Sequence, residues 1–157
     1  MARSILRGDA ELRRALKGIP ELTSRGLDKA VKDSLEPMRK QTSLNALRLR
    51  QPGTSPPGGH LDQGVVIQKV SGRGKVLRTF WVSLTKRARY LGHLVEWGTA
   101  PHFQPRRFGG ILHPGARPKP FATPAYESTK DETVSTLSRA TWGLIERAAL
   151  TFGRRAK

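Results

Sequence analysis

The stretch YLGHLVEWGT, residues 90–99, is the part of the chain from which the fold is best predicted. Its apolar residues recur at helical spacing, which places Tyr90, Leu91, Leu94 and Trp97 on one face of a short helix. Gly98 predicts the end of that helix, because glycine adopts the conformation that closes helices without steric cost. Glu96 lies in the last turn, and we expect its carboxylate to accept hydrogen bonds from backbone or arginine donors.

Upstream of this short helix, the sequence has the pattern of a β-hairpin. Residues 65–70 and 76–84 are rich in β-branched and aromatic side chains, and SGRG at 71–74 predicts a glycine turn between them. Residues 51–64 contain three prolines and four glycines, which predicts a loop. Residues 1–50 carry apolar side chains at helical spacing, and a kink or break is expected at Pro37.

Downstream, a proline-rich segment leads into the clearest helix of the chain. Residues 98–124 hold six prolines and four glycines in 27 positions, a density that predicts a basic loop without regular structure. Residues 125–150 have acidic residues near their start, basic residues at or beyond their end, and a helical apolar stripe. That stripe consists of Val134, Leu137, Thr141, Leu144, Ile145 and Ala148.

Together these elements predict one α+β domain over residues 1–157. Its parts are a helical N-terminal part (1–50), a loop (51–64), the hairpin and short helix (65–97), the Pro/Gly-rich basic loop (98–124) and a C-terminal helix (125–150). The expected architecture is a small antiparallel sheet packed by a long N-terminal helix and a C-terminal helix, with long basic loops.

The charge of the chain is concentrated in its middle. The formal net charge is +17, and residues 37–120 contain fifteen basic and only two acidic residues. Such an excess favours phosphates, an anionic membrane surface or an acidic protein as a partner, although a merely solvated face has the same composition. The candidate basic surface for a partner or for DNA consists of Arg73, Lys75, Arg87, Arg89, Arg106, Arg107, Arg117 and Lys119.

Several classes of protein are disfavoured by composition and spacing. The chain has no cysteine, which excludes disulfides and thiolate zinc sites, and its apolar runs are too short for a membrane span. Gly72, Gly74 and Lys75 do not match a Walker loop, because Val76 stands where a magnesium-binding Ser or Thr belongs. His93 and Glu96 are three residues apart, yet the four histidines show no HExxH arrangement. We therefore expect neither catalysis nor a metal or cofactor.

Three patches of the sequence together resemble a known pattern. Gly59-His60-Leu61, after the proline-rich stretch, is similar to a motif in which Pro is followed by Thr-Gly, any residue and Leu. Tyr90 with LVEWGT at 94–99 is similar to a box of Tyr, then Val-Glu-Phe-Gly-Thr. KPFATPAY at 119–126, followed by KDE at 130–132, is similar to the Pro-Phe, two residues, Pro-Ala-Phe entrance to a final helix.

Over residues 20–150 the chain thus resembles the tailed-bacteriophage head-tail joining or tail-completion family, the lambdoid-phage gene-product-ten-like morphogenesis proteins. It departs from the family pattern at Gly58-Gly59, where Thr-Gly is usual, and in its long basic insertion at 101–119. The residues that match the family boxes are Tyr90, Glu96, Trp97, Gly98, Thr99, Pro120, Phe121 and Pro124.

The resemblance implies a structural virion protein of the neck or upper tail of a long-tailed phage, assembled in the bacterial host cytoplasm. It would form a homo-oligomeric ring, with six copies favoured over twelve, and would bind adjacent neck or tail proteins, with non-specific contact to packaged DNA and no membrane. The basic middle alone supports a different class, a free nucleic-acid-binding protein, and a peripheral membrane protein ranks last.

Overall fold

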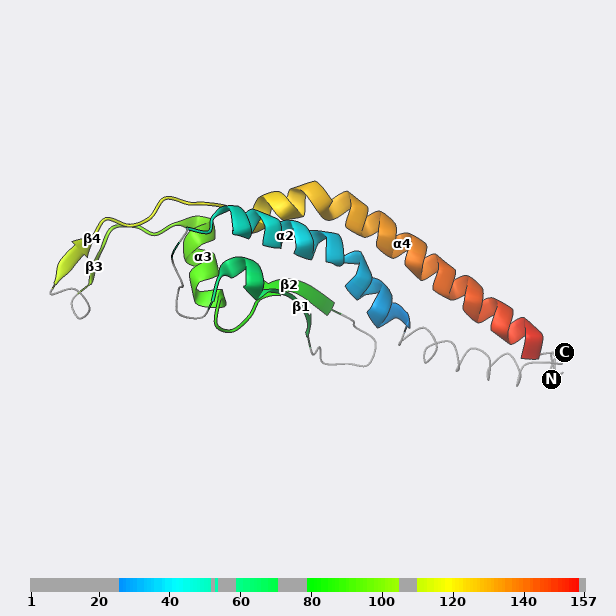
Figure 1. Ribbon diagram of the computed structural model, residues 1–157. Coiled ribbons are helices and arrows are strands. Elements are labelled where there is room, and N and C mark those ends of the chain that lie inside the picture. The colour runs from blue at the N-terminus through cyan, green and yellow to red at the C-terminus, as the bar shows by residue number, and fades with distance from the viewer. Residues whose placement is uncertain (1–25, 52, 54–58, 71–78, 105–109, 156–157) are drawn as a thin grey trace, which may run out of the picture. The chain divides into compact units, whose positions relative to one another are not determined.

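The protein is an α+β protein, as expected from the sequence, but it contains two small antiparallel sheets where one was predicted (Figure 1). The computed structural model describes residues 26–51, 53, 59–70, 79–104 and 110–155. The chain divides into two compact units, a central unit of Leu35–Thr133 and a helical unit whose described residues are 26–34 and 134–155. The turn at 71–74 and the basic residues Arg73, Lys75, Arg106 and Arg107 lie outside the described residues.

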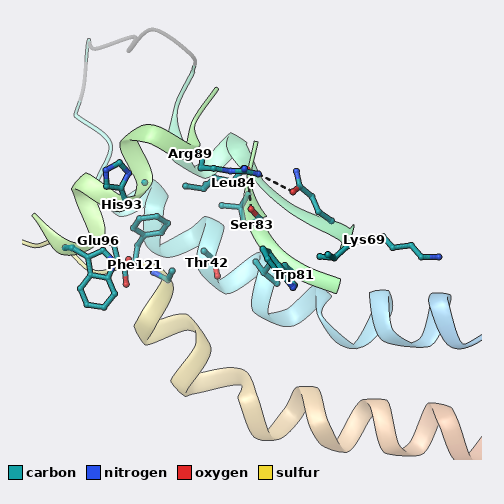
Figure 2. A pocket seen from close by; sticks show the side chains of 16 residues that line it. Thr42, Lys69, Trp81, Ser83, Leu84, Arg89, His93, Glu96 and Phe121 are labelled. Carbon is teal, nitrogen blue, oxygen red and sulfur yellow. Dashed lines mark hydrogen bonds between the residues drawn. The ribbon is translucent and has the colours of Figure 1, made fainter. Parts of the chain in front are cut away.

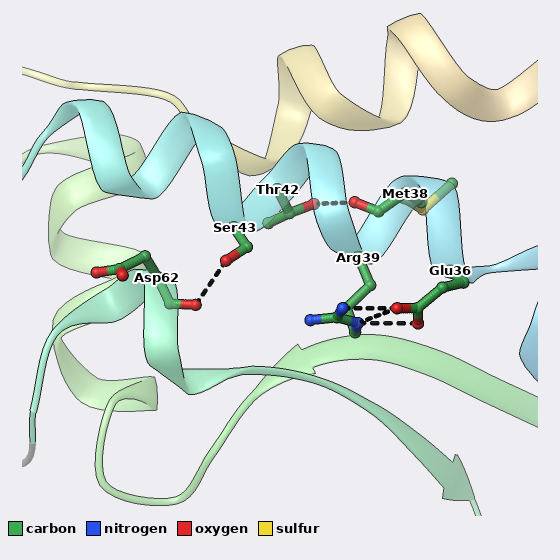
Figure 3. A network of polar contacts seen from close by, with 6 residues as sticks. All are labelled: Glu36, Met38, Arg39, Thr42, Ser43 and Asp62. Carbon is green, nitrogen blue, oxygen red and sulfur yellow. Dashed lines mark hydrogen bonds and ion pairs between the residues drawn. The ribbon is translucent and has the colours of Figure 1, made fainter.

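The predicted break at Pro37 is confirmed. Residues 26–34 are helical, Leu35 interrupts the helix, and α2 then runs over Glu36–Arg48 with Pro37 in its first turn. Proline is accommodated there because the first-turn N–H groups of a helix have no intrahelical acceptor. Glu36 also forms an ion pair of 2.6 Å with Arg39 in this turn (Figure 3).

In the central unit, α2 is joined to the segment that enters the hairpin. The predicted loop at 51–64 ends in a single turn of 3-10 helix, η1 (Leu61–Gly64). The Ser43 hydroxyl donates to the Asp62 carbonyl oxygen at 2.7 Å, as Figure 3 shows, and Arg50 forms an ion pair of 2.9 Å with the Asp62 carboxylate. These contacts fix the chain where it leaves the loop and enters the first strand.

The predicted hairpin is present as β1 (Val65–Val70) and β2 (Thr79–Leu84), paired antiparallel with Val65 opposite Leu84. The short helix α3 follows at Arg89–Trp97. Gly92 brings α3 close to the hairpin, because a Cβ at this position would overlap the Leu84 side chain. The core of the central unit is built mainly from small residues, and its larger member Phe121 is 2% exposed. Its buried apolar residues are Ala46, Val65, Ala88, Phe121 and Ala125.

The predicted loop at 98–124 contains regular structure, so this expectation is wrong in part. Strands β3 (His102–Gln104) and β4 (Ile111–His113) pair antiparallel, and Thr99 and Ala116 extend the ribbon by two backbone hydrogen bonds of 2.9 and 3.0 Å. We call residues 99–104 and 110–116 the arm. Proline density misled the prediction because Pro101 and Pro114 lie beside the two strands rather than inside them.

The final helix, α4, runs over Ala122–Arg155 and is longer at both ends than the predicted 125–150. Pro124 lies in its first turn, as expected. In the helical unit, Ala30, Ser34 and Ala148 are buried, and Leu144 lies against Gly26. The predicted apolar stripe is only partly covered, since Val134 and Ile145 are exposed. Within the described ranges, no helix is long and apolar enough to cross a membrane.

Replacing Gly98 by Ala is expected to destabilise the protein. Gly98 has φ +72° and ψ −173°, a region almost restricted to glycine, and a Cβ there would overlap the Ala116 carbonyl oxygen. We expect a loss of about 1–3 kcal/mol in the free energy of unfolding, measured by urea denaturation.

Gly143→Ala is the matched control for this change. Gly143 lies inside α4, where the nearest atom to an added Cβ is 3.9 Å away. This substitution is therefore expected to stabilise the protein by about 0.5–1 kcal/mol. Equal effects of the two substitutions would contradict the role assigned to Gly98.

Candidate functional site

The site is centred on the buried carboxylate of Glu96, in the last turn of α3. Glu96 is 7% exposed and accepts four hydrogen bonds from the start of α4. The backbone N–H groups of Phe121, Ala122 and Thr123 donate at 2.8, 2.9 and 2.9 Å, and the Thr123 hydroxyl donates at 2.6 Å. The prediction that Glu96 accepts from backbone donors is thus confirmed, with α4 as their source.

This arrangement caps α4 from a distant part of the chain. The first N–H groups of a helix lack intrahelical acceptors, and the helix dipole favours negative charge at that end. The first turn of α4 contains no acidic residue of its own. Glu96, 25 residues before Phe121, supplies both the missing acceptors and the missing charge.

The hydrogen bonds also determine the ionisation of Glu96. Burial by itself would raise the pKa of this carboxyl, but the Thr123 hydroxyl and the three backbone N–H groups together outweigh it and lower the pKa below its ordinary value of 4.5. Glu96 is therefore an anion at neutral pH, and both of its oxygens are engaged by α4.

Two further hydrogen bonds stabilise the junction between the end of α3 and the start of α4. The Asn45 side-chain amide of α2 donates to the Phe121 carbonyl oxygen at 3.1 Å, and the Lys119 N–H donates to the Val95 carbonyl oxygen at 2.8 Å. Gly98 turns the chain away immediately after α3, and Thr99 pairs with Ala116. The ends of three helices therefore meet at Glu96 and Phe121.

Beside this junction lies a groove of about 620 Å³, shown in Figure 2. Its lining comes from α2, both strands of the hairpin, α3 and the start of α4. Buried Val65, Gly92 and Phe121 contribute to it, whereas Trp81 and Trp97 are 57% and 75% exposed. The groove is thus largely apolar and carries two indole rings that water reaches.

The residues of the family boxes divide into buried and exposed groups. Glu96, Gly98, Thr99 and Phe121 form the junction, and Phe121 is 2% exposed. The short helix expected to carry Tyr90, Leu91, Leu94 and Trp97 is present as α3, and Tyr90 and Trp97 are 52% and 75% exposed. Pro120 and Pro124 are also exposed.

The basic residues within the described ranges are not gathered at one cavity. Arg87, Arg89, Arg117 and Lys119 are all exposed. Arg89 lines the groove, whereas Lys119 lines a separate hollow of about 240 Å³ beside the Arg50–Asp62 ion pair. No local sequence pattern predicts the groove itself, because its lining is assembled from positions spread between Thr42 and Ala122.

The histidines do not assemble a metal centre among the residues that the structure describes, which contain no group of three His, Cys, Asp or Glu side chains placed to hold an ion. His93 and Glu96 share α3, but both Glu96 oxygens are directed at α4. In the arm, His102 and His113 are cross-strand partners whose rings stack at 5.1 Å. The Gly115 N–H donates to the His113 Nδ1 at 3.0 Å.

Comparisons with known proteins give no indication of what the site does. No protein-family model matches the chain, and neither a curated protein nor a solved structure of significant similarity was found. A function for the site must therefore be inferred from its residues and their contacts.

Glu96→Gln is expected to destabilise the central unit. The amide keeps one oxygen but turns an NH₂ group toward backbone N–H donors, so that at least one buried donor loses its acceptor. Hydrogen bonds to a charged group contribute about 1.5–3 kcal/mol each, and we expect a loss of at least that size by urea denaturation. Glu127→Gln, at an exposed residue that pairs with Lys130, is the control and should change little. Equal effects would contradict the capping role.

Stability is also expected to fall at acid pH because of Glu96. Its pKa is lower in the folded protein than in the unfolded chain, so its contribution is present above pH 4.5 and is lost as pH falls through the folded value. Urea midpoints measured between about pH 7 and about pH 3 should show the difference between wild type and Glu96→Gln narrowing below pH 4.5. A difference that stays constant would show that the charge of Glu96 is not responsible.

Proposed function

We propose that this protein is a structural subunit of the neck or upper tail of a long-tailed bacteriophage, joining head and tail as part of a ring. It acts by binding copies of itself and an adjacent neck or tail protein, without catalysis. The motif resemblance supports this proposal, and so does a contact between two of the motifs. Glu96 of the LVEWGT box binds the helix start that the KPFATPAY box forms.

The exposed apolar face of the arm is the observation that most strongly supports this proposal. Phe103 and Leu112 are cross-strand partners, so their side chains share one face of the ribbon, and they are 61% and 66% exposed. A two-stranded ribbon is only marginally stable in water when nothing covers it. Large apolar side chains on such a ribbon favour burial against another subunit.

A ring is the assembly that fits this kind of contact. If the arm of one copy packs on a different surface of the next, the interface is heterologous, and such interfaces close into rings when the rotation allows. Copies with a net charge of +17 repel one another, and an acidic neighbouring protein or packaged DNA would reduce that repulsion. Six copies remain our preferred number, with twelve as the alternative.

The second candidate is a free nucleic-acid-binding protein. It is favoured by the exposed cations Arg87, Arg89, Arg117 and Lys119. Such a protein would stay monomeric or dimeric and lose affinity for DNA steeply as salt rises, because phosphate contacts release counterions. The state of assembly therefore distinguishes the two candidates.

The test is the sedimentation of the purified chain over a range of concentration and salt. We expect a ring-sized species, and we expect Phe103→Asp combined with Leu112→Asp to convert it to monomer while the circular dichroism spectrum is retained. Gln104→Glu is the control, because Gln104 pairs with Ile111 and so lies on the opposite face of the ribbon. A chain that remains monomeric throughout and binds DNA in a salt-dependent way would favour the second candidate.

A further inference from the structure

In the helical unit, α4 carries apolar side chains on two of its faces. One face is covered by the chain itself, since Leu144 lies against Gly26. The other face is open to water, with Val134 and Trp142 each 63% exposed and Ile145 49% exposed. A helix that packs only within its own chain needs one apolar face, so a second face of this size indicates a contact with another molecule.

The exposed residues form one continuous stripe along the helix. They follow one another at spacings of three and four, which places them on the same side of α4. Every member of the stripe is exposed. We call this set the outer stripe, and it consists of Val134, Ser138, Trp142, Ile145 and Ala149.

Two opposite charges border the outer stripe along the same edge. Arg139 and Glu146 are seven residues apart, close to two helical turns, so one lies above the other on α4. Both side chains are exposed. Seven residues separate the two positions by about 10 Å along the helix axis, which is too far for them to pair within one helix.

We infer that the outer stripe packs against the outer stripe of a second copy, with the two α4 helices antiparallel and related by a two-fold axis. The axis passes between Trp142 and Gly143, because this point is also midway between Arg139 and Glu146. A two-fold of this kind brings the same edge of both helices together. Arg139 of each copy therefore comes level with Glu146 of the other.

Charge complementarity selects this occupant and this direction. A parallel pair would instead bring the two charges against the opposite edge of the stripe, which contains no acidic or basic residue within the helical unit. That edge consists of Leu137, Thr141, Leu144 and Ala148. Only the antiparallel pair gives each charge an opposite charge on the second copy.

The same axis also fits the apolar side chains together. Residues equally far from the axis on the two helices come level, so Ile145 lies between Ser138 and Trp142 of the second copy. Trp142 lies beside the axis, between Trp142 and Ile145 of the second copy. Each large side chain thus enters the space between two residues of the facing stripe, which is how helices pack closely.

The distribution of charge along the chain permits this contact. Residues 134–151 contain two arginines and one glutamate, whereas most of the net charge of +17 belongs to residues 37–120. Repulsion between two copies is therefore small along the outer stripe itself. A two-fold contact is complete with two copies, so it goes beyond the proposed ring and does not depend on it. With three large apolar side chains per copy, we expect the dimer to be weak.

Cross-linking tests the inference on the full chain, which has no cysteine of its own. The background is the arm variant, Phe103→Asp with Leu112→Asp, so that contacts through the arm do not contribute. Arg139→Cys and Glu146→Cys are made separately in this background and mixed. A thiol cross-linker shorter than the separation of like positions, about 10 Å along the axis, should join the two variants in the mixture but neither variant to itself.

The matched control for the cross-link is a mixture of Arg147→Cys with Glu146→Cys. Arg147 lies on the side of α4 away from the outer stripe, where its guanidinium donates to the Gly143 carbonyl oxygen at 2.9 Å. This mixture should give no cross-link. Trp142→Ser should abolish the cross-link between Arg139→Cys and Glu146→Cys. Leu150→Ser, at another exposed apolar residue beyond the charged edge, should leave it unchanged.

Charge reversal without cysteines tests the two ion pairs. In the arm variant at high concentration, Arg139→Glu should weaken dimerisation measured by sedimentation about threefold to tenfold, because like charges then meet at both ends of the contact. Adding Glu146→Arg should restore the dimer, since opposite charges meet again. Arg147→Glu changes the net charge equally outside the stripe and should have no such effect.

Three outcomes of the cross-linking would overturn the inference: no cross-link in the mixture, equal cross-linking in the mixture and in the single variants, or a cross-link that survives Trp142→Ser. A stripe covered within its own chain would overturn it too. That result would appear in the dilute, monomeric arm variant as a larger loss of unfolding free energy for Trp142→Ser than for Leu150→Ser. Because every measurement uses the arm variant, the proposal of a ring stands or fails separately.

Discussion

The capping of α4 by Glu96 is the interaction on which the rest of the central unit depends. The residues that precede α4, Lys119-Pro120-Phe121, offer no side-chain oxygen to accept its first N–H groups, so a buried acceptor must come from elsewhere. Glu96 reaches them only because α3 ends at Gly98, which turns the chain away without a Cβ against Ala116. Asn45 then ties α2 to the same point through the Phe121 carbonyl oxygen.

This capping also decides what the surface of the unit can bind. Since both oxygens of Glu96 are engaged by α4, the groove beside it presents mainly apolar groups. The arm offers a different chemistry, with Phe103 and Leu112 exposed on one face of a narrow ribbon. Two surfaces of unlike character on one subunit are compatible with the ring that we propose, in which each copy would contact both its own copies and another protein.

The internal pairing of Glu96 was predictable from the sequence. The residues that complete the junction around it were not. Glu96 stood out as one of two acidic residues in a strongly basic segment, and internal pairing was the natural expectation. The absence of an N-cap residue before Ala122 was the available sign that α4 needs a remote cap. Thr123 and Asn45 gave no such sign, because their contacts reach across 27 and 76 residues. The helix that carries Tyr90 and Trp97 was predictable, but the exposure of the two rings was not, since periodicity identifies a helix face and not whether anything covers it.

The sequence by itself determined the local features of this protein. Pro37 and Gly98 set helix boundaries, β-branched runs formed β1 and β2, and the composition set a charge of +17, because each depends on dihedral preference, side-chain spacing or residue count. Only the tertiary structure decided that the proline-rich segment pairs as the arm, that Glu96 caps α4, and that Trp81 and Trp97 border one groove. Those features depend on groups brought together from distant positions, and no local pattern encodes that proximity.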